Sequence, residues 1–204
     1  MSDQPAANPR GGVLTWALWC AALLGVAAVL YIIVQASFKP TQPGGLKSVA
    51  RGEMAKLVVP AEATVGPANT FYDADGKPLR VADLKGKVVV LNLWATWCAP
   101  CVAEMPTLAK LQAEYAGKPV EVVAVSVDSP SAVDKAKAFI AQHAPLKYYS
   151  DPNMKLPFAL KPPAAGMPTT VIYGADGLER GRISGGADWS GADAKALVDR
   201  VLAG

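Results

Sequence analysis

Two cysteines separated by two residues, Cys98 and Cys101, are the side chains of this chain best suited to chemistry. They lie in the segment Trp97-Cys98-Ala99-Pro100-Cys101, between a valine-rich run and a segment with helical periodicity. At the start of a helix, two sulfurs at this spacing can close a disulfide without rearranging a domain. The free amides and dipole of a helix N-terminus favour the thiolate and lower a thiol pKa to about 3.5 to 7.5. We therefore expect Cys98 to attack a disulfide as the nucleophile and Cys101 to resolve the mixed disulfide.

Other chemistry for the pair is less well supported by its surroundings. A structural disulfide stays open, although it gives no reason for Trp97 or for a position at a helix start. A zinc site needs two further ligands, and residues 39–204 hold no third cysteine and one histidine, His143. We interpret His143 as a solvated residue at a helix C-terminus, where a cation is favoured. We expect no metal and no other cofactor.

Alternating apolar runs and helical patterns supply the elements that must hold the pair. Val88–Leu93 is a nearly unbroken apolar run, typical of a strand buried on both faces. The segment from Pro100 to about Gly117 is helical, and Pro106 should kink it because proline has no amide hydrogen. The other predicted elements are strands at 70–72, 120–127, 147–150, 169–173 and 178–184, a return segment at 79–84, helices at 130–143 and 191–203, and a short irregular helix at 153–160. This order predicts an α/β fold with a central mixed sheet and helices on both faces.

One local block makes the chain more apolar than an ordinary soluble domain. The mean hydropathy is +0.22 and only 18% of the residues are charged. Val13–Val34 is apolar apart from Thr15. As a helix rising about 1.5 Å per residue, this run would measure roughly 33 Å and cross a hydrocarbon core of about 30 Å. We predict a short tail at 1–12 and a transmembrane anchor at 13–36, with a cleaved signal peptide as the alternative; Cys20 is interpreted as an inert residue of the anchor.

The rest of the chain has the composition of one globular domain. The net charge is +3, and without a basic run longer than a pair it argues against nucleic acid as a partner. Residues 37–59 are predicted as a linker followed by a short amphipathic helix. Its apolar residues recur at helical spacing, with Gly52 as a weak point; they are Leu46, Val49, Ala50, Met54 and Leu57. We interpret this helix as packing on its own domain at 60–204, with partner binding as the alternative.

Three motifs occur together in this domain. They are Trp94-Ala95-Thr96-Trp97-Cys98-Ala99-Pro100-Cys101 after a valine-rich strand, Glu104-Met105-Pro106, and Gly166-Met167-Pro168-Thr169-Thr170 before a later strand. Together they resemble the thioredoxin fold and, more closely, the membrane-anchored TlpA/ResA-like thiol–disulfide oxidoreductases. The resemblance covers about residues 60–204. It implies a thioredoxin fold with an inserted strand–helix element, formed by 120–143 or by the segment after it.

The resemblance also implies roles for residues around the pair. It implies a cis Met167–Pro168 bond against the cysteines, with Trp97, Met167 and Pro168 in contact with the substrate. Glu104, three residues after the second cysteine, is implied to handle the proton of the buried thiol. A carboxyl in a partly apolar site has a raised pKa suited to that task. Minimal thioredoxins carry an aspartate where this chain has Asn92, which cannot titrate. The alternative for Glu104 is an exposed glutamate on the helix surface.

The same resemblance implies the direction of the redox reaction, the partners and the location of the protein. It implies a reductase of cysteine pairs in apocytochromes c or in copper-site proteins of respiratory oxidases, re-reduced by a membrane electron donor. It implies a single-pass inner-membrane protein with its domain in the periplasm. The charges near the anchor weakly favour the opposite orientation, since Arg10 precedes it and Lys39, Lys47 and Arg51 follow it. We follow the resemblance, because a tethered reductase is needed in an oxidising compartment.

Two alternatives share the thioredoxin fold. A Sco-like copper metallochaperone is also anchored, but such proteins use a CxxxC spacing and a distal histidine as copper ligands. Here the spacing is CxxC and His143 lies far from the pair in sequence. A peroxidase is the weaker alternative, because the usual context of a peroxidatic cysteine is not visible.

Overall fold

The computed structural model describes residues 10–37 and 44–204. Residues 1–9 of the predicted tail and 38–43 of the predicted linker lie outside these ranges. The first described range is a single helix, α1 (Arg10–Ser37), which begins inside the predicted tail. Its described side chains are Trp16 and residues 18–31, all exposed, and they include the free Cys20. Within residues 10–37 and 44–204, no helix is both long enough and apolar enough to cross a membrane.

A second compact unit begins at Pro43 and contains a mixed sheet of seven strands. The strands are β1 (Phe71–Asp73), β2 (Pro78–Leu79), β3 (Val88–Trp94), β4 (Val120–Ser126), β5 (Tyr149–Ser150), β6 (Thr169–Tyr173) and β7 (Glu179–Ser184). Their order is β2-β1-β5-β4-β3-β6-β7. The central strands β3 and β4 are parallel, and β6 runs antiparallel to β3. The predicted mixed sheet is confirmed.

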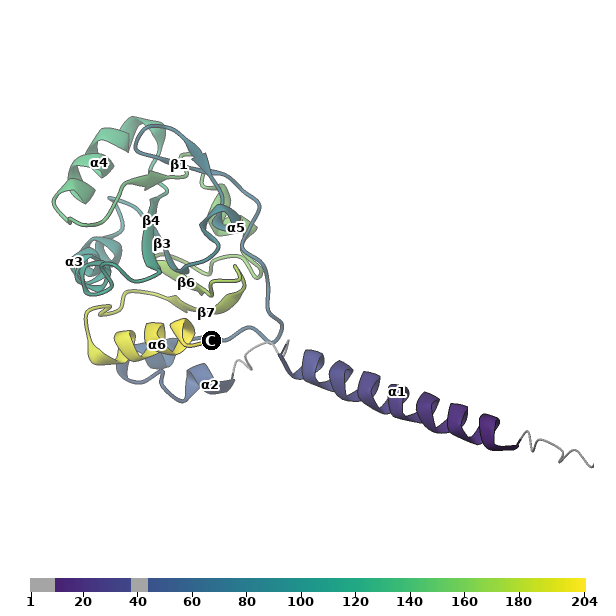
Figure 1. The fold of residues 1–204 in the computed structure, drawn as a ribbon. Helices are drawn as coiled ribbons and strands as arrows, with labels where there is room; N and C mark the ends of the chain where they lie inside the picture. Colours follow the sequence, from purple (N-terminus) through teal and green to yellow (C-terminus); the bar gives the residue numbers. More distant parts are fainter. Residues whose placement is uncertain (1–9, 38–43) are drawn as a thin grey trace, which may run out of the picture. The chain divides into compact units, whose positions relative to one another are not determined.

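Helices cover both faces of this sheet, as predicted. On one side lie α3 (Ala99–Glu114), α4 (Val133–Ala141) and α6 (Ala192–Leu202), and on the other lies α5 (Lys155–Ala159), as Figure 1 shows. Short 3-10 turns precede β3 and α4; they are η2 (Val81–Leu84) and η3 (Pro130–Ala132). α3 continues through Pro106 to Glu114.

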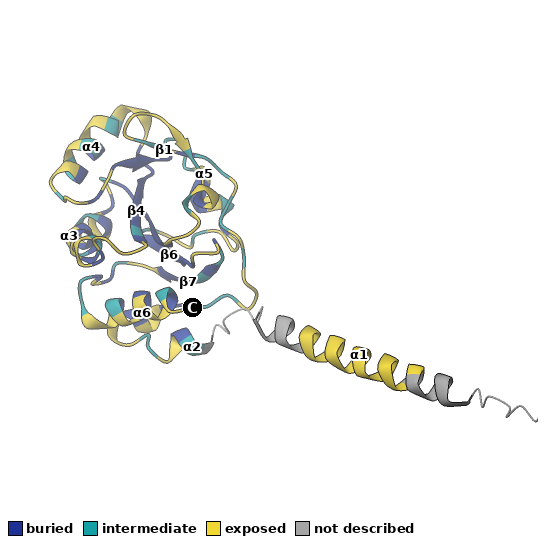
Figure 2. Cartoon of the chain, viewed as in Figure 1, coloured by how far each residue is buried: buried dark blue, intermediate teal, exposed yellow. Residues whose placement is uncertain are grey.

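Alternate residues of β3 point to opposite faces, and this places the polar Asn92. Val88, Val90 and Trp94 belong to the core cluster shared with α3 and α6, whereas Val89, Leu91 and Leu93 belong to the cluster shared with α5. All seven residues of β3 are buried, which explains the unbroken apolar run (Figure 2). Asn92 has the same parity as Val90 and Trp94, so its side chain faces α3.

The predicted amphipathic helix at 46–57 is wrong as a single element. The chain forms two short turns instead, α2 (Gly44–Lys47) and the 3-10 helix η1 (Gly52–Lys56). α2 ends at Lys47, and Gly52, the first residue of η1, has a φ of +54°, a conformation that glycine adopts freely but that a continuous helix does not contain. The interpretation that this region packs on its own domain is confirmed, because Leu46, Met54 and Leu57 are buried in the core.

Two predicted strands are shorter than the sequence suggested. The return segment at 79–84 pairs only at Pro78–Leu79 and then turns into η2, where Asp83 accepts a hydrogen bond from the Arg80 amide at 2.9 Å. Of residues 147–150, only Tyr149 and Ser150 form a strand.

Both segments that were candidates for the inserted element contain regular structure, with α4 in the first and β5 in the second.

The outer strand β7 is bordered by the segment that precedes the sheet. Val58 and Arg182 form a bridge with both backbone hydrogen bonds at 2.9 Å. A second bridge joins Val65 to Leu178. At the opposite edge, β2 has two residues and begins with Pro78.

Candidate active site

The cysteine pair lies at the N-terminus of α3 and forms a disulfide. The S–S distance is 2.02 Å and the Cα atoms are 5.2 Å apart. Cys98 is the N-cap residue, in extended conformation, and Pro100 lies in the first helical turn, where its missing N–H removes no helical hydrogen bond. Cys98 is 7% exposed, whereas Cys101 is fully buried. The first sulfur is therefore the more accessible to a partner.

Asp128 fixes the loop that leads into the pair. Its carboxylate accepts hydrogen bonds from the Thr96 amide at 3.0 and 3.2 Å and from the Thr96 hydroxyl at 2.8 Å. Ser126 also donates its hydroxyl to this carboxylate, at 2.8 Å. Sequence reasoning missed Asp128. The available signal was a Ser-x-Asp sequence at the carboxyl end of a strand parallel to β3, because such strand ends meet at one edge of a sheet.

Glu104 is buried one helical turn after Cys101. Its carboxylate accepts a hydrogen bond from Asn92 Nδ2 at 2.7 Å and another from the Ala187 amide at 3.0 Å. Burial raises the pKa of Glu104 to about 7, although these hydrogen bonds and the charge of Lys56 act to lower it. The alternative of an exposed surface glutamate is wrong, because the loop after β7 covers this face of α3.

Asn92 occupies the centre of this polar group. Its amide nitrogen donates to Glu104 and, at 2.9 Å, to the hydroxyl of Thr170 on β6. Its amide oxygen has no hydrogen-bond partner. The buried indole nitrogen of Trp189 also lacks a partner within hydrogen-bond distance, yet it is close enough to help lower the pKa of Glu104. Asn92 thus holds the carboxyl without competing for its proton.

Of the three residues expected to contact the substrate, Trp97 and Met167 line the same groove as Cys98, and Pro168 follows Met167 in the chain. Trp97 is 62% exposed, Met167 is half-buried and Pro168 is buried. The Met167–Pro168 bond is cis. The Gly185 amide donates to the Pro168 carbonyl at 2.8 Å.

An apolar groove of about 470 Å³ joins Cys98 to part of this group. It is lined by Trp97, Cys98, Ala99, Pro100, Met154, Pro157, Phe158, Ala164, Gly166 and Met167. Phe158 of α5 is 71% exposed and forms one wall. The sequence did not single out Phe158, because one aromatic residue in a short helix carries no pattern.

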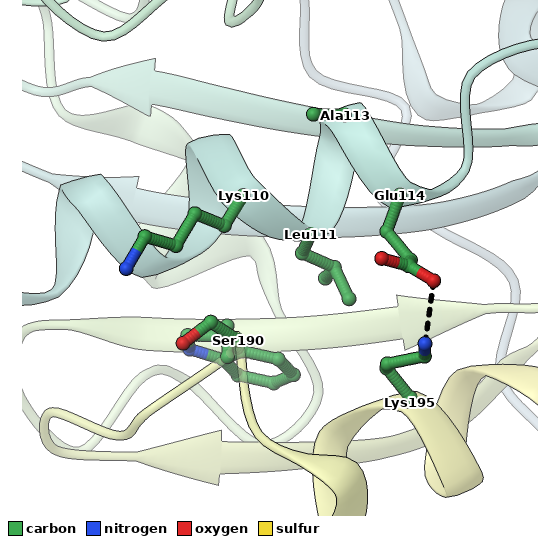
Figure 3. Close-up of a pocket in the computed structure, with 7 residues that line it drawn as sticks. Lys110, Leu111, Ala113, Glu114, Ser190 and Lys195 are labelled. Carbon is green, nitrogen blue, oxygen red and sulfur yellow. Dashed lines mark hydrogen bonds and ion pairs between the residues drawn. The ribbon is translucent and has the colours of Figure 1, made fainter.

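A second hollow, of about 540 Å³, lies between α3 and α6 (Figure 3). Lys195 of α6 pairs with Glu114 of α3 at its rim. Its lining includes Trp189 but neither cysteine. It is therefore separate from the groove beside Cys98.

His143 is held within its own helical region. Its Nδ1 lies 2.8 Å from the Phe139 carbonyl and its ring centroid lies 4.5 Å from that of Phe139. Among the residues that the structure describes, no group of three or more histidine, cysteine or acidic side chains is placed to hold a metal ion. His143 follows the C-terminal end of α4, as predicted, but it is only partly exposed because its ring packs on Phe139.

Comparisons with known proteins match the domain that contains this site. A family model described as Redoxin covers residues 60–197. The thiol-disulfide oxidoreductase ResA of Oceanobacillus iheyensis is 52% identical over 61 residues, 30% of this chain and 32% of that protein. ResA of Bacillus subtilis is 32% identical over 118 residues, 57% of this chain and 64% of that protein. The matched segments thus span between about a third and two thirds of these relatives.

A solved structure covers more of the domain. The thiol:disulfide interchange protein of Chlorobium tepidum, a thioredoxin family protein, matches with a TM-score of 0.58 at 27% identity, covering 70% of this chain and 99% of that one. The architecture is therefore a thioredoxin-like α/β fold with a mixed sheet. These similarities support a redox enzyme of the thioredoxin type.

Proposed function

The chain belongs to the Redoxin family, and from that premise we propose that it is a thiol–disulfide oxidoreductase that reduces protein disulfides. The observation that carries the proposal is the Cys98–Cys101 disulfide at the start of α3, with one accessible sulfur and a buried Glu104 one turn further along. Free helix amides and the helix dipole stabilise the thiolate of the N-cap cysteine.

The reductive half-reaction begins from the dithiol form. The Cys98 thiolate attacks one sulfur of the partner's disulfide, whose S–S bond breaks, and the released partner thiolate takes up a proton. Cys101 then passes its thiol proton to Glu104 and attacks Cys98 Sγ. The mixed disulfide breaks, and the second partner sulfur leaves and is protonated. Two electrons have moved to the partner, and the enzyme ends as the disulfide present in the structure.

Glu104 suits the proton step because its pKa is raised to about 7. Near neutral pH it therefore exists in both protonation states and can accept the Cys101 proton and later return it. An external dithiol must restore the reduced pair by the reverse exchange. We assign that role to a membrane electron donor.

The finer proposal concerns location. The domain is tethered to the inner membrane by residues 13–36 and faces the periplasm. The proposal is supported by the uncharged sequence from Gly11 to Phe38, which lies mostly within α1, and by the resemblance to anchored reductases. Protease treatment of spheroplasts should digest the domain, whereas protection of the domain until the membrane is lysed would contradict the orientation.

The proposed partners are apocytochromes c or copper-site proteins of respiratory oxidases. Support comes from the family resemblance, since a cysteine pair must be reduced before haem or copper is attached. The copper-chaperone alternative is not favoured, because the relatives named above are thiol–disulfide proteins. Copper titration of the reduced domain separates the two functions.

Substitution of the two cysteines tests the core proposal. Cys98→Ser should abolish insulin reduction, because the attacking sulfur is lost. Cys101→Ser should accumulate a mixed disulfide, because the resolving sulfur is lost, and trapping from membranes should capture the partner. Retention of full insulin reduction by Cys98→Ser would overturn the mechanism.

A further inference from the structure

The loop that covers Glu104 makes several contacts with the reactive end of α3. This loop, residues 185–191, joins β7 to α6. The Ala187 amide donates to Glu104 Oε2 at 3.0 Å, and the Trp189 amide donates to the Thr107 hydroxyl at 3.0 Å. That hydroxyl donates to the Glu104 carbonyl at 2.7 Å. The position of this loop therefore decides how well the carboxyl of Glu104 is covered and hydrogen-bonded.

Two side chains of η1 hold the loop on both sides of Ala187. Lys56 Nζ donates to the Gly186 carbonyl at 3.0 Å, and the Asp188 amide donates to Glu53 Oε2 at 2.5 Å. Gly186 also packs against α3, since a Cβ placed there would lie 3.5 Å from Pro100. We call Glu53 and Lys56, with the two hydrogen bonds they make to this loop, the η1 clamp.

The base of the η1 clamp is fixed in the domain. Met54, between the two side chains, is 1% exposed, and Leu57 is 5% exposed. The next residue, Val58, is bonded to Arg182 of β7 by both backbone hydrogen bonds. Glu53 and Lys56 therefore extend from a rigid support, and they precede the residues 60–197 that match the family model.

The groups around Glu104 are neutral on three of the surrounding elements and charged on the fourth, η1. β3 and β6 contribute the neutral side chains of Asn92 and Thr170, and the covering loop contributes the Ala187 amide and the Trp189 indole. Among the described residues, Lys56 is the charged side chain whose field acts on Glu104, and it favours the carboxylate. One residue thus combines a mechanical contact with the loop and an electrostatic effect on the proton-carrying group.

We propose that Glu53 and Lys56 are positioning residues for Glu104. They hold residues 186–188 over the carboxyl of Glu104 and set its proton affinity, although they lie before the residues that match the family model. The inference rests on the proposed function, because it assigns a regulator to the proton step of that site. Both residues act through their hydrogen bonds to the covering loop, and Lys56 acts through its charge as well.

The test measures the proton on Glu104 directly. Carbon-13 NMR of the full-length oxidised chain in detergent gives the titration midpoint of Glu104, assigned with Glu104→Gln. Lys56→Met should raise this midpoint by about half a unit or more, because a nearby cation is lost. Lys56→Arg should keep it near the wild-type value, and Lys47→Met removes a cation from the neighbouring α2 as the matched control. An unchanged midpoint in Lys56→Met, or an equal rise in Lys47→Met, would overturn the proposal.

A second measurement tests the hydrogen bonds of the clamp. In Glu53→Ala, the Ala187 amide should exchange with solvent about threefold faster or more, because local opening of the loop becomes easier. Unchanged exchange would contradict the positioning role of Glu53. Both readouts are independent of activity: a wild-type chain that reduces no disulfide would refute the proposed function, and a shifted Glu104 midpoint in Lys56→Met would still support the clamp.

Discussion

Replacing Glu104 by glutamine should make the oxidised protein gain stability relative to the wild type as the pH rises. In the folded state burial raises the pKa of Glu104 to about 7, against an ordinary value of 4.5. Between these values the native state binds more protons than the unfolded state, so the free energy of unfolding of the wild type falls as pH rises. The difference of about 2.5 units corresponds to about 3 kcal/mol, lost progressively from pH 4.5 and fully lost above about pH 8.

Glutamine removes this pH-dependent loss and adds a constant cost. Its amide group would face the donors Asn92 Nδ2 and Ala187 N–H, and one of these donors would lose its acceptor at every pH. The informative quantity is therefore the change with pH in the difference between the two proteins, rather than the difference at one pH.

Denaturant unfolding of the disulfide form, followed by circular dichroism at pH 4.5 and at pH 8, measures this change. The difference between Glu104→Gln and wild type should move by about 3 kcal/mol in favour of the variant. Glu62→Gln, at an exposed glutamate, is the matched control and should show no comparable movement. The reasoning is refuted if the stability difference for Glu104→Gln is the same at both pH values.

Two further predictions concern residues that support the site. Arg182→Met should lower the free energy of unfolding by about 3 to 5 kcal/mol, because it leaves the buried Glu179 carboxylate without its partner; Arg180→Met, which breaks an ion pair with a more exposed partner, should cost less than about 1 kcal/mol. Equal losses in urea unfolding would show that burial of the pair is unimportant. Asp128→Ala should lower the free energy of unfolding by about 1 to 3 kcal/mol and slow insulin reduction, because the amide and hydroxyl of Thr96 beside the cysteines lose their acceptor. Unchanged stability and an unchanged rate would rule out this support.

Local patterns predicted the reactive pair and the central strand. Cys98 and Cys101 follow an apolar run long enough to be recognised as a buried strand, so their position at a helix start could be inferred before any tertiary contact was known. The activation of Cys98 follows from that position at the start of a helix. The N-terminal turn η1 was misjudged for the same reason, since local periodicity does not register a positive φ at Gly52.

The surroundings of the pair could not be predicted in this way. The burial of Glu104 depends on Ala187, 83 positions away in sequence, and Asp128 reaches Thr96 only because β3 and β4 are parallel neighbours. Such contacts arise when the sheet assembles. The family resemblance predicted that Glu104 handles a proton, but the groups that cover it became visible only in the fold.

The short bridges beside β7 have a consequence for the behaviour of many copies of this protein at high local concentration. An exposed sheet edge offers free backbone donors and acceptors, and it promotes aggregation when chains are crowded. Within residues 44–204, Val58 and Val65 occupy part of the outer side of β7, and the other edge is limited to Pro78 and Leu79. Neither edge therefore presents a long template for a strand of a neighbouring molecule, so crowded copies are protected against edge-to-edge association.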